Sequence, residues 1–549
     1  MSDRLLLRPW QRVAFDAFTS SNEPDFLAVA TPGAGKTTFA LACARWVLAQ
    51  QRRRVVVVAP TTHLKTQWTI AAHRLGLELD HNWSPSDGIA RDVHGIVTTY
   101  QQVATADTAR ILRGAAHDAF VILDEIHHAG DERAWGSGVR TAFESAHRRL
   151  CLSGTPFRSD TASIPFVRYA ETGAGGEAQP DFTYGYADAL RDGGVVRPVY
   201  FPRFDGLMEW SAPDGSILSA GFHDELDRAG QSHRLRAALS LQGEWLPAVV
   251  GQAHDRLMQI RTTHPDAAGL AICIDQEHAR ELARLIRTRC GVEAEVVVSD
   301  DPGASAKIAA FAASDRPWLV AVRMVSEGVD IPRLRVGVYA STVVTELFFR
   351  QAVGRFVRWT RGMSTQKAYM YLPDDPRLRA HAFQIAEARR HVLRPPTERE
   401  DDFSPDDARL EAELELFAGY EQLSLFNVLS SVATGMTVHA FTEMGLTLFD
   451  DEPEMPEPSG EFDVGLDLDD IPTDAGFVLT GSTSVAERKQ DLRDRNMDLA
   501  RRLVDLTGWN HGRVQAELNR LAGISSVGSA TNEQLERRLR HGEAWLRRR

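Results

Sequence analysis

Residues 26–40 read FLAVATPGAGKTTFA, an apolar run followed by a glycine-bearing turn and then by a helical pattern. The turn nearly matches the pattern G-x-x-x-x-G-K-[ST], with Ala30 in place of the first glycine. Between a strand and a helix, such a turn binds phosphates, because backbone N–H groups approach the oxygens and the helix amino terminus favours negative charge. Ala30 ends the strand, where only a small side chain is needed. A chance glycine turn is the alternative that this stretch alone leaves open.

The turn therefore predicts a nucleotide site in which different residues bind the phosphates and the metal ion. Lys36 would reach the β- and γ-phosphates, and the Thr37 hydroxyl would ligate Mg²⁺. Backbone N–H groups of the small residues before Lys36 would contact phosphate oxygens. The predicted ATP-binding residues of this stretch are Pro32, Gly33, Ala34, Gly35, Lys36, Thr37 and Thr38.

A second stretch, VILDEIHH at residues 121–128, places two acids at the end of an apolar run. Ligand sites of parallel sheets form at such strand ends. Asp124 would hold the Mg²⁺ shell, and Glu125 would orient and activate the attacking water. His127 and His128 suggest zinc as an alternative, but adjacent histidines face different ways, which favours hydrogen bonding within the site.

Short apolar runs alternate with helical patterns through the first 375 residues, which is typical of a parallel sheet with helices on both faces. The first series is FLAVA (26–30), VVVVAP (55–60), GIVTTY (95–100), FVILDE (120–125) and RLCLSG (149–154). The second is LAICID (270–275), a run near 295–299, WLVAVR (318–323), VGVYAS (336–341) and AYMYLP (368–373). We therefore predict an α/β fold with one lobe at 1–202 and another at 263–376, joined by a helical connector or insertion at 203–262.

The composition is that of a globular protein, with 43% hydrophobic and 25% charged residues in a 549-residue chain too long for one core. No apolar run is long enough to span a membrane, and the first 25 residues do not resemble a secretory signal, so we expect a cytoplasmic protein. The four cysteines form no C-x-x-C pair. They indicate neither a disulfide framework nor a zinc ribbon.

Acidic residues are concentrated in one part of the chain. Residues 398–475 hold 22 Asp and Glu against 2 Arg, whereas the whole chain has a net charge of -13, so the remainder is mildly basic. We predict a helical extension at 377–449, an acidic disordered linker at 450–480 and a basic helical tail domain at 481–549. Ser484 with Glu487, and Thr531 with Gln534, have the spacing of capping boxes that begin helices.

Two arginines stand three residues apart in RQAVGRFVR at 350–358. On a helix, Arg355 and Arg358 would share one face and could point at a single target. A planar, permanently charged guanidinium suits the charge that spreads over phosphate oxygens as the bond breaks. If these side chains meet Lys36 across two lobes, ATP binding must draw the lobes together. An ordinary ion pair is the alternative for either arginine alone.

The order of these motifs resembles that of superfamily 2 DExH-box helicases and translocases, in the branch of XPB and of the ATPase parts of type I and type III restriction enzymes. LRPWQRVAF (7–15) is similar to the family's adenine-reading segment, and DEIH is a variant of its D-E-x-H box. LSGTPF (152–157), SEGVDIP (326–332) and RQAVGRFVR match later motifs. The resemblance implies two tandem RecA-like lobes with parallel sheets, followed here by carboxy-terminal helical regions. It adds Gln11, Gly328 and Asp330 at the nucleotide, and Ser153, Thr155 and Gln351 in coupling.

The resemblance also implies that ATP hydrolysis drives movement along nucleic acid, with ATP and Mg²⁺ as cofactors. Hydroxyls grip phosphates without reading bases, as a stepping motor requires. The candidate contacts are Thr61, Thr62, Thr98, Thr99, Arg323 and Ser326. DNA is favoured over RNA by the resemblance alone, and the pathway would be repair or defence against foreign DNA.

Other functions remain open from the sequence. The chain could be a nucleotide-switched module that clamps nucleic acid and signals to a partner, an RNA helicase, or a fused nuclease, although no clear nuclease pattern follows residue 375. Residues 487–549 carry 14 basic and 9 acidic residues, which fits either a nucleic-acid-binding domain or a docking bundle for a protein partner. The acidic stretch is either a plain linker or a mimic of DNA.

Overall fold

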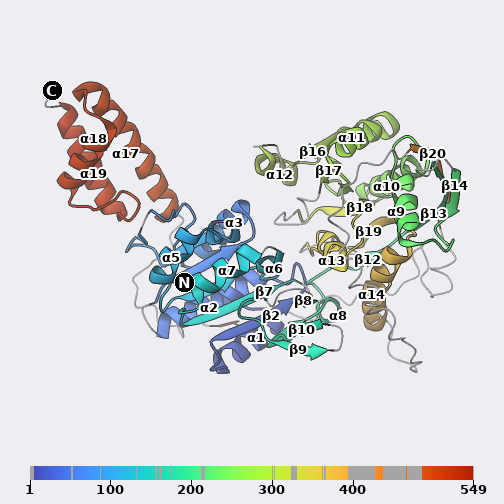
Figure 1. The fold of residues 1–549 in the computed structure, drawn as a ribbon, viewed down its shortest axis with the longest axis horizontal. Coiled ribbons are helices and arrows are strands. Elements are labelled where there is room, and N and C mark those ends of the chain that lie inside the picture. The colour runs from blue at the N-terminus through green and yellow to red at the C-terminus, as the bar shows by residue number, and fades with distance from the viewer. Residues whose placement is uncertain are drawn as a thin grey trace. The chain divides into compact units, whose positions relative to one another are not determined.

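The fold is described from a computed structural model of the whole chain (Figure 1). It describes residues 5–50, 53–86, 88–131, 133–154, 158–159, 164–172, 175–211, 217–298, 301, 303–322, 331–360, 363, 366–393, 427–436, 465–466 and 485–547. The chain divides into two compact units, of which the first comprises residues 1–29, 35–183 and 462–549 and the second comprises 30–34 and 184–461. Each unit contains one large sheet.

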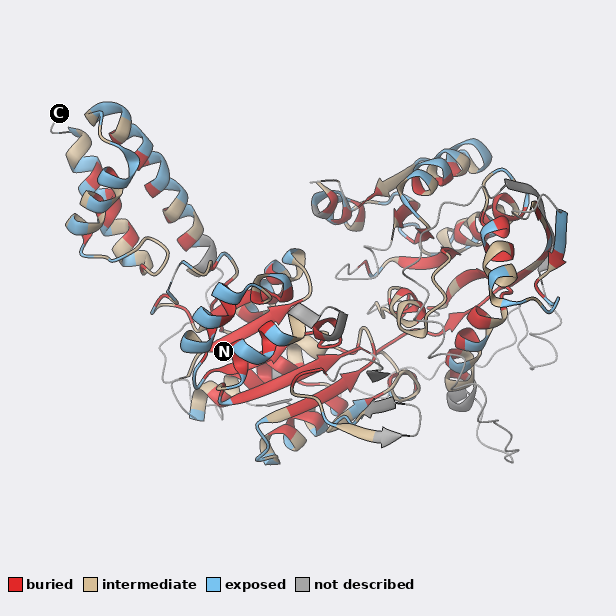
Figure 2. Ribbon diagram, in the orientation of Figure 1, coloured by how far each residue is buried: buried red, intermediate tan, exposed pale blue. Residues whose placement is uncertain are grey.

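The first sheet has seven strands in the order β11-β2-β7-β6-β3-β5-β4. These are β2 (Asp25–Ala30), β3 (Val55–Ala59), β4 (Leu79–Asp80), β5 (Gly95–Thr99), β6 (Phe120–Leu123), β7 (Arg148–Ser153) and β11 (Phe182–Tyr184). The pairings from β2 to β4 are parallel. The central strands are buried along their whole length (Figure 2), as expected for parallel strands covered on both faces.

Helices follow these strands in sequence. They are α1 (Pro9–Ser20), α2 (Lys36–Gln50), α3 (Thr62–Arg74), α4 (Tyr100–Val103), α5 (Ala106–Ala115), α6 (His128–Asp131) and α7 (Arg133–Phe143). A small antiparallel sheet joins β8 (Arg158–Ser159), β10 (Gly175–Ala178) and β9 (Tyr169–Thr172). β1 (Leu5–Leu6) pairs with β21 (Gly465–Leu466).

The second sheet has the order β14-β13-β19-β18-β15-β17-β16, with β12 beside β19 and β20 beside β13. Its strands are β12 (Val199–Tyr200), β13 (Arg203–Ser211), β14 (Ile217–Gly221), β15 (Ala268–Cys273), β16 (Ala294–Val297), β17 (Trp318–Val322), β18 (Leu334–Ala340), β19 (Ala368–Pro373) and β20 (Asn427–Met436). The run from β16 to β19 is parallel, and β14 and β20 are antiparallel to β13. The predicted α/β fold with two parallel sheets is therefore confirmed.

The helices of this second unit are α8 (Tyr186–Arg191), α9 (Arg228–Ala238), α10 (Trp245–Arg261), α11 (Gln276–Cys290), α12 (Ala304–Ala312), α13 (Glu346–Val353) and α14 (Pro376–Leu393). Residues 203–262, expected to be helical, contain α9 and α10 but also β13 and β14, which extend the sheet. Residues 377–449 likewise contain β20 besides most of α14. Both segments are thus less helical than expected, because strand pairing with β19 and β13 recruits them.

The tail forms three helices, α17 (Val485–Thr507), α18 (His511–Ala522) and α19 (Asn532–Arg547), around a shared apolar core. The capping box of α19 is present, because Thr531 N–H donates to Gln534 Oε1 at 2.9 Å and Gln534 N–H donates to Thr531 Oγ1 at 3.3 Å. α17 begins directly after Ser484, as expected, although Ser484 and the Glu487 side chain lie outside the described residues. The predicted acidic linker is also outside them, apart from β21.

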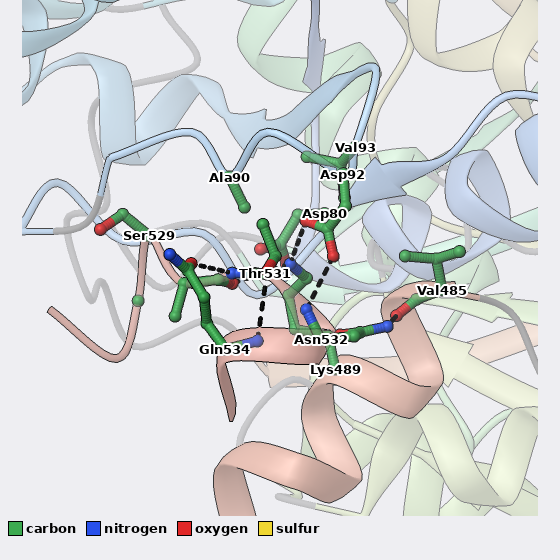
Figure 3. Close-up of polar contacts among 12 residues, drawn as sticks. Asp80, Ala90, Asp92, Val93, Val485, Lys489, Ser529, Thr531, Asn532 and Gln534 are labelled. Carbon is green, nitrogen blue, oxygen red and sulfur yellow. Dashed lines mark hydrogen bonds and ion pairs between the residues drawn. The ribbon is translucent and has the colours of Figure 1, made fainter. Parts of the chain in front are cut away.

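The tail bundle docks on the first sheet's unit through charged contacts to β4 and to the segment after it (Figure 3). Lys489 Nζ lies 2.5 Å from Asp92 Oδ1, and the Asn532 N–H donates to Asp92 Oδ2 at 2.9 Å. Arg493 Nη2 lies 3.2 Å from Asp80 Oδ2. The partners in these contacts are some 400 residues apart in sequence. Through these contacts the tail belongs structurally to the first unit.

Two expectations about the chain as a whole can be compared with the described residues. Cys43, Cys151, Cys273 and Cys290 are free thiols, the first three of them buried. None of the helices in the described ranges is both long enough and apolar enough to cross a membrane.

Candidate nucleotide site

The phosphate-binding turn lies between the end of β2 and the start of α2. Gly33 and Gly35 have φ angles of +82° and +97°, which disfavour any residue with a side chain. A Cβ on Gly35 would also lie 2.7 Å from Gln11 Nε2. α2 begins at Lys36, so its amino terminus directs N–H groups toward the turn, as the sequence predicted.

Gln11 is buried on α1 and ties this helix to the turn. Its Nε2 donates to the Gly35 carbonyl at 2.8 Å, and its Oε1 accepts from the Arg8 N–H at 2.8 Å. The amide keeps one further hydrogen and one further lone pair after these two bonds. Reading of the adenine base by Gln11 therefore remains a proposal, while its support of the turn is a feature that the sequence did not reveal.

Asp124 follows β6 directly and is held by bonds to three other elements. Its N–H donates to the Val58 carbonyl at 3.0 Å, and its carbonyl accepts from the Tyr100 hydroxyl at 2.9 Å. Its Oδ2 accepts from Trp68 Nε1 at 2.8 Å. Burial, followed by the neighbouring charge of Glu125, raises the pKa of Asp124 to about 6. The carboxylate is thus fixed in one orientation in a site poor in water.

Glu125 adopts a left-handed backbone conformation with φ +47°, which is uncommon for a residue with a side chain. Its Oε1 lies 3.1 Å from Lys36 Nζ, and its Oε2 accepts from the Gly154 N–H at 2.9 Å. Burial opposes the charged form, but Lys36, His127 and these hydrogen bonds outweigh it and lower the pKa of Glu125 to about 2. The phosphate-loop lysine and the catalytic candidate of the DEIH box therefore form one ion pair.

The segment after β7 contacts this ion pair, as expected for a coupling motif. Ser153 is buried, and its Oγ lies 3.3 Å from His127 Nδ1. The same His127 nitrogen lies 3.6 Å from Glu125 Oε2. The hydrogen-bonding role predicted for His127 is therefore observed. Within the described part of the chain, no group of three or more His, Cys, Asp or Glu could hold a metal ion.

The threonines proposed as nucleic-acid contacts fall into two groups. Thr61 and Thr62 lie at the start of α3, and Thr62 is exposed. Thr98 and Thr99 are only 0% and 4% exposed, and their hydroxyls bond to Gln102. This burial contradicts the expectation of a surface role for these two hydroxyls. They instead fix the turn from β5 into α4.

The second unit contains the arginine motif, but the predicted helix face is wrong. α13 ends at Val353, so Gln351 lies on the helix whereas Arg355 and Arg358 follow it. Arg358 forms an isolated antiparallel bridge with Val196 instead. The chain leaves the helical path at this point because it pairs with residues 196–197. Convergence of these arginines with Lys36 remains a proposal.

Five predicted site residues lie outside the described part of the chain: Thr155, Arg323, Ser326, Gly328 and Asp330. Among the described residues, sequence reasoning missed Trp68 and the Gly154 N–H, both of which contact the acidic pair. Trp68 lies seven residues after Thr61, but its spacing from Asp124 in the sequence carries no signal. Only the packing of α3 against β3 and β5 brings Trp68 to Asp124.

The residues present fit a nucleoside triphosphate and Mg²⁺. The two positive-φ glycines allow the tight turn that exposes backbone N–H groups to phosphate oxygens, and the start of α2 lies next to it. Lys36, Thr37 and Thr38 are all partly exposed, so they are accessible to a ligand. The Thr37 hydroxyl and the Asp124 carboxylate are the hard oxygen donors that Mg²⁺ prefers.

Comparison with known proteins agrees with this site. Residues 4–158 match the sequence model of the family described as type III restriction enzyme, res subunit. An uncharacterised protein of Mycobacterium tuberculosis is 47% identical over 390 residues, which cover 70% of this chain and 64% of that protein. One of Mycobacterium leprae is 46% identical over 399 residues, covering 72% of this chain and 66% of the relative. The matched part thus spans slightly less than two thirds of these relatives.

Among solved structures, the ATP-dependent type ISP restriction-modification enzyme LlaBIII bound to DNA is 14% identical, with a TM-score of 0.45, and the match covers 75% of this chain and 33% of that one. At this level of similarity we take nothing further from that structure. Residues 4–158 thus match the family of type III restriction enzyme res subunits, and the order of the motifs resembles that of superfamily 2 helicases in the branch of the type I and type III restriction ATPases.

Proposed function

We propose that this chain is a nucleic-acid-stimulated ATPase that acts as a DNA helicase or translocase. The observation that carries the proposal is the ion pair between Lys36 and Glu125, at 3.1 Å, in contact with the Gly154 N–H. It joins the phosphate loop, the acidic box and the coupling motif in one hydrogen-bonded group. These are the parts that phosphoryl transfer to water requires.

In the proposed reaction, Lys36 exchanges Glu125 for the β- and γ-phosphates when ATP binds. Loss of the lysine contact would raise the pKa of Glu125, because that charge is the main cause lowering it. The freed carboxylate would then orient the attacking water and accept its proton. Thr37 and Asp124 would hold Mg²⁺, which would neutralise charge that develops on the phosphates.

Gly154 and Ser153 would transmit the state of the site to the rest of the chain. When Glu125 moves, its hydrogen bond from the Gly154 N–H would break, so the state of the carboxylate would be felt at Gly154. His127 connects the same carboxylate to Ser153. Arg355 and Arg358 would supply positive charge to the transferred phosphate from the second lobe. A cycle that opens and closes two lobes moves an extended polymer lying across them.

DNA is the polymer we propose, with Thr61 and Thr62 as contacts on the first lobe. Their position at the start of α3 offers both hydroxyls and N–H groups to a phosphate backbone. Arg323 and Ser326 would serve on the second lobe. As the pathway we propose either DNA repair or defence against foreign DNA.

Measurement of ATP hydrolysis with single-stranded DNA, duplex DNA and RNA tests the proposal. We expect stimulation by DNA, and Lys36→Ala or Glu125→Gln should lower kcat at least about 100-fold, the usual contribution of a positioned acid or base. Glu144→Gln, an exposed carboxylate at the end of the α7 region, should change kcat less than about twofold. Stimulation by RNA alone would refute the choice of DNA.

A second set of outcomes separates a motor from a nucleotide switch. Triplex displacement and strand separation, measured side by side, should show movement along DNA in at least one assay. ATP-dependent binding of DNA without turnover above that of Glu125→Gln would instead support a switched binding module. Hydrolysis at the wild-type rate by the Lys36→Ala protein would overturn the assignment of the site.

A further inference from the structure

Arg197 is a buried arginine in the segment between α8 and β12, with a side chain only 1% exposed. Its guanidinium donates to the Pro332 carbonyl at 2.8 Å and to the Leu334 carbonyl at 3.2 Å. It also lies 3.3 Å from Thr360 Oγ1. One side chain thus contacts two segments that are far apart in sequence.

These two segments flank the motifs of the second lobe. Pro332 is the last residue of SEGVDIP, and Leu334 begins β18. Thr360 follows RQAVGRFVR by two residues, and the Arg197 N–H itself donates to the Val357 carbonyl at 2.9 Å. Val196 forms a bridge with Arg358 directly beside this bond. The backbone and the side chain of Arg197 therefore both contact the arginine motif.

The guanidinium of Arg197 is bonded to uncharged acceptors. The acceptors described for the guanidinium are two carbonyls and a hydroxyl, without a carboxylate among them. Burial first, and then the charges of Arg335 and Arg358, lower the pKa of Arg197 to about 9. Holding a cation beside two others in the interior opposes folding, and an apolar side chain would avoid this. The planar fork of an arginine can donate to both segments at once in fixed directions, which neither an apolar side chain nor a lysine can do.

We propose that Arg197 is a positioning residue that holds the Arg355–Arg358 segment in register with the segment ending at Pro332. This inference rests on the proposed function, because it assigns the purpose of the register to ATP hydrolysis. Arg197 touches no nucleotide in the proposal. It acts through the position of Arg358. The backbone bridge between Val196 and Arg358, and the bond from the Arg197 N–H to the Val357 carbonyl, fix that position.

Lysine at this position should fail to replace arginine. A lysine keeps the positive charge but donates from a single nitrogen, so it cannot hold carbonyls of one segment and a hydroxyl of the other in fixed directions. The proposal therefore predicts that Arg197→Lys leaves the Lys36 site able to bind ATP and impairs the step that needs Arg358. A fall in kcat with little change in nucleotide affinity is the expected signature.

Arg234 provides a matched control within the same unit. It is also a fully buried arginine that donates to backbone carbonyls, at 2.6 Å to Gly221 and 2.8 Å to Asp224. Both of these acceptors lie outside the segments that carry the motifs. Both of its bonds come from the same nitrogen, Nη1, so Arg234→Lys should leave the segments of the motifs and catalysis unchanged.

The experiment measures three quantities in the full-length chain for the wild type, Arg197→Lys and Arg234→Lys. These are hydrogen–deuterium exchange of residues 332–336 and 355–360 without nucleotide, affinity for a fluorescent ATP analogue, and DNA-stimulated kcat. We expect Arg197→Lys to accelerate exchange in both segments and to lower kcat about tenfold or more, with affinity changed less than about threefold. Arg234→Lys should leave hydrogen exchange in these two segments unchanged. Its kcat should stay within about twofold of the wild-type value.

Each other outcome is decisive. Unchanged exchange in Arg197→Lys overturns the positioning role whatever the enzyme activity. Equal losses of kcat in the two variants show that Arg197 is merely structural. A wild-type chain without ATPase activity defeats the proposed function, but the exchange measurement still decides whether Arg197 joins the two segments.

Discussion

At the scale of single residues, the phosphate turn depends on the absence of a side chain at Gly35. Its φ of +97° and the 2.7 Å separation between an added Cβ and Gln11 Nε2 both oppose alanine. Gly35→Ala should weaken ATP binding at least about tenfold, which corresponds to about 1.4 kcal/mol. Titration of a fluorescent ATP analogue measures this. Gly291→Ala, where φ is +70° but no atom lies within 4 Å of the new Cβ, should lower stability without changing affinity.

Most residues of the first lobe's site could be predicted from the sequence because they lie in contiguous motifs. Lys36, Asp124 and Glu125 stand at strand ends, where the order of a parallel sheet brings them to one edge. Trp68 could not be predicted, since its contact with Asp124 depends on how α3 packs. The threonines of β5 were predicted on the surface because burial of a hydroxyl bonded to Gln102 leaves no mark in sequence.

At the scale of elements, uniformly apolar strands were predicted well and mixed ones were not. β3 and β6 consist of apolar residues alone, and both lie at the predicted positions. β13 was read as part of a helical connector because residues 203–262 carry helical stripes and the sequence of β13 shows no strict apolar alternation. Arg203 is buried in β13, where it lies 3.0 Å from Asp374. Buried and more exposed side chains alternate along much of β13 in the structure, but apolar and polar residue types do not strictly alternate in its sequence.

The packing of α3 against β3 and β5, which brings Trp68 to Asp124, leads to a prediction about metal dependence. Trp68→Phe keeps the ring packing but removes the hydrogen bond that orients Asp124. Loss of a bond to a metal-binding carboxylate usually lowers metal affinity 10- to 100-fold, so we expect the Mg²⁺ concentration for half-maximal ATPase to rise by about tenfold. Trp245→Phe removes an equivalent 3.1 Å bond to the Asp205 carbonyl and should leave it unchanged. Equal Mg²⁺ requirements in the two variants would argue against Asp124 as a ligand.

At the scale of the whole molecule, the tail is a docking bundle in this structure. Many of its exposed basic residues pair with acids of the bundle itself: Arg488 with Glu536, Arg495 with Asp491, Arg501 with Asp498, Arg520 with Glu517, Arg537 with Glu533 and Arg547 with Glu543. Lys489 instead contacts the segment after β4, and Arg493 contacts Asp80 in β4. All of these contacts lie within the chain, so nucleic-acid binding by the tail and docking of a protein partner both stay proposals.

Removing Lys489 and removing Asp92 from the docking contact should have different effects on stability, because the lysine side chain is 1% exposed and the aspartate side chain is 25% exposed. Asp92→Ala leaves the Lys489 ammonium buried without its carboxylate, which should cost about 3 kcal/mol, near the lower end for a broken buried pair. Lys489→Met removes the buried charge instead, while Asp92 keeps water and the Asn532 N–H, so the cost should stay below about 1 kcal/mol.

Hydrogen exchange of the α17 and α19 amides in the full-length chain measures these stability costs within the tail. A single melting temperature would not, because the chain has several domains. Arg501→Ala breaks a pair whose side chains are 67% and 71% exposed, and it should change exchange by less than about 0.5 kcal/mol. If Asp92→Ala behaves like Arg501→Ala, the tail does not depend on this contact. If Lys489→Met instead costs more than Asp92→Ala, the lysine's bond to the Ala530 carbonyl within the bundle outweighs the ion pair.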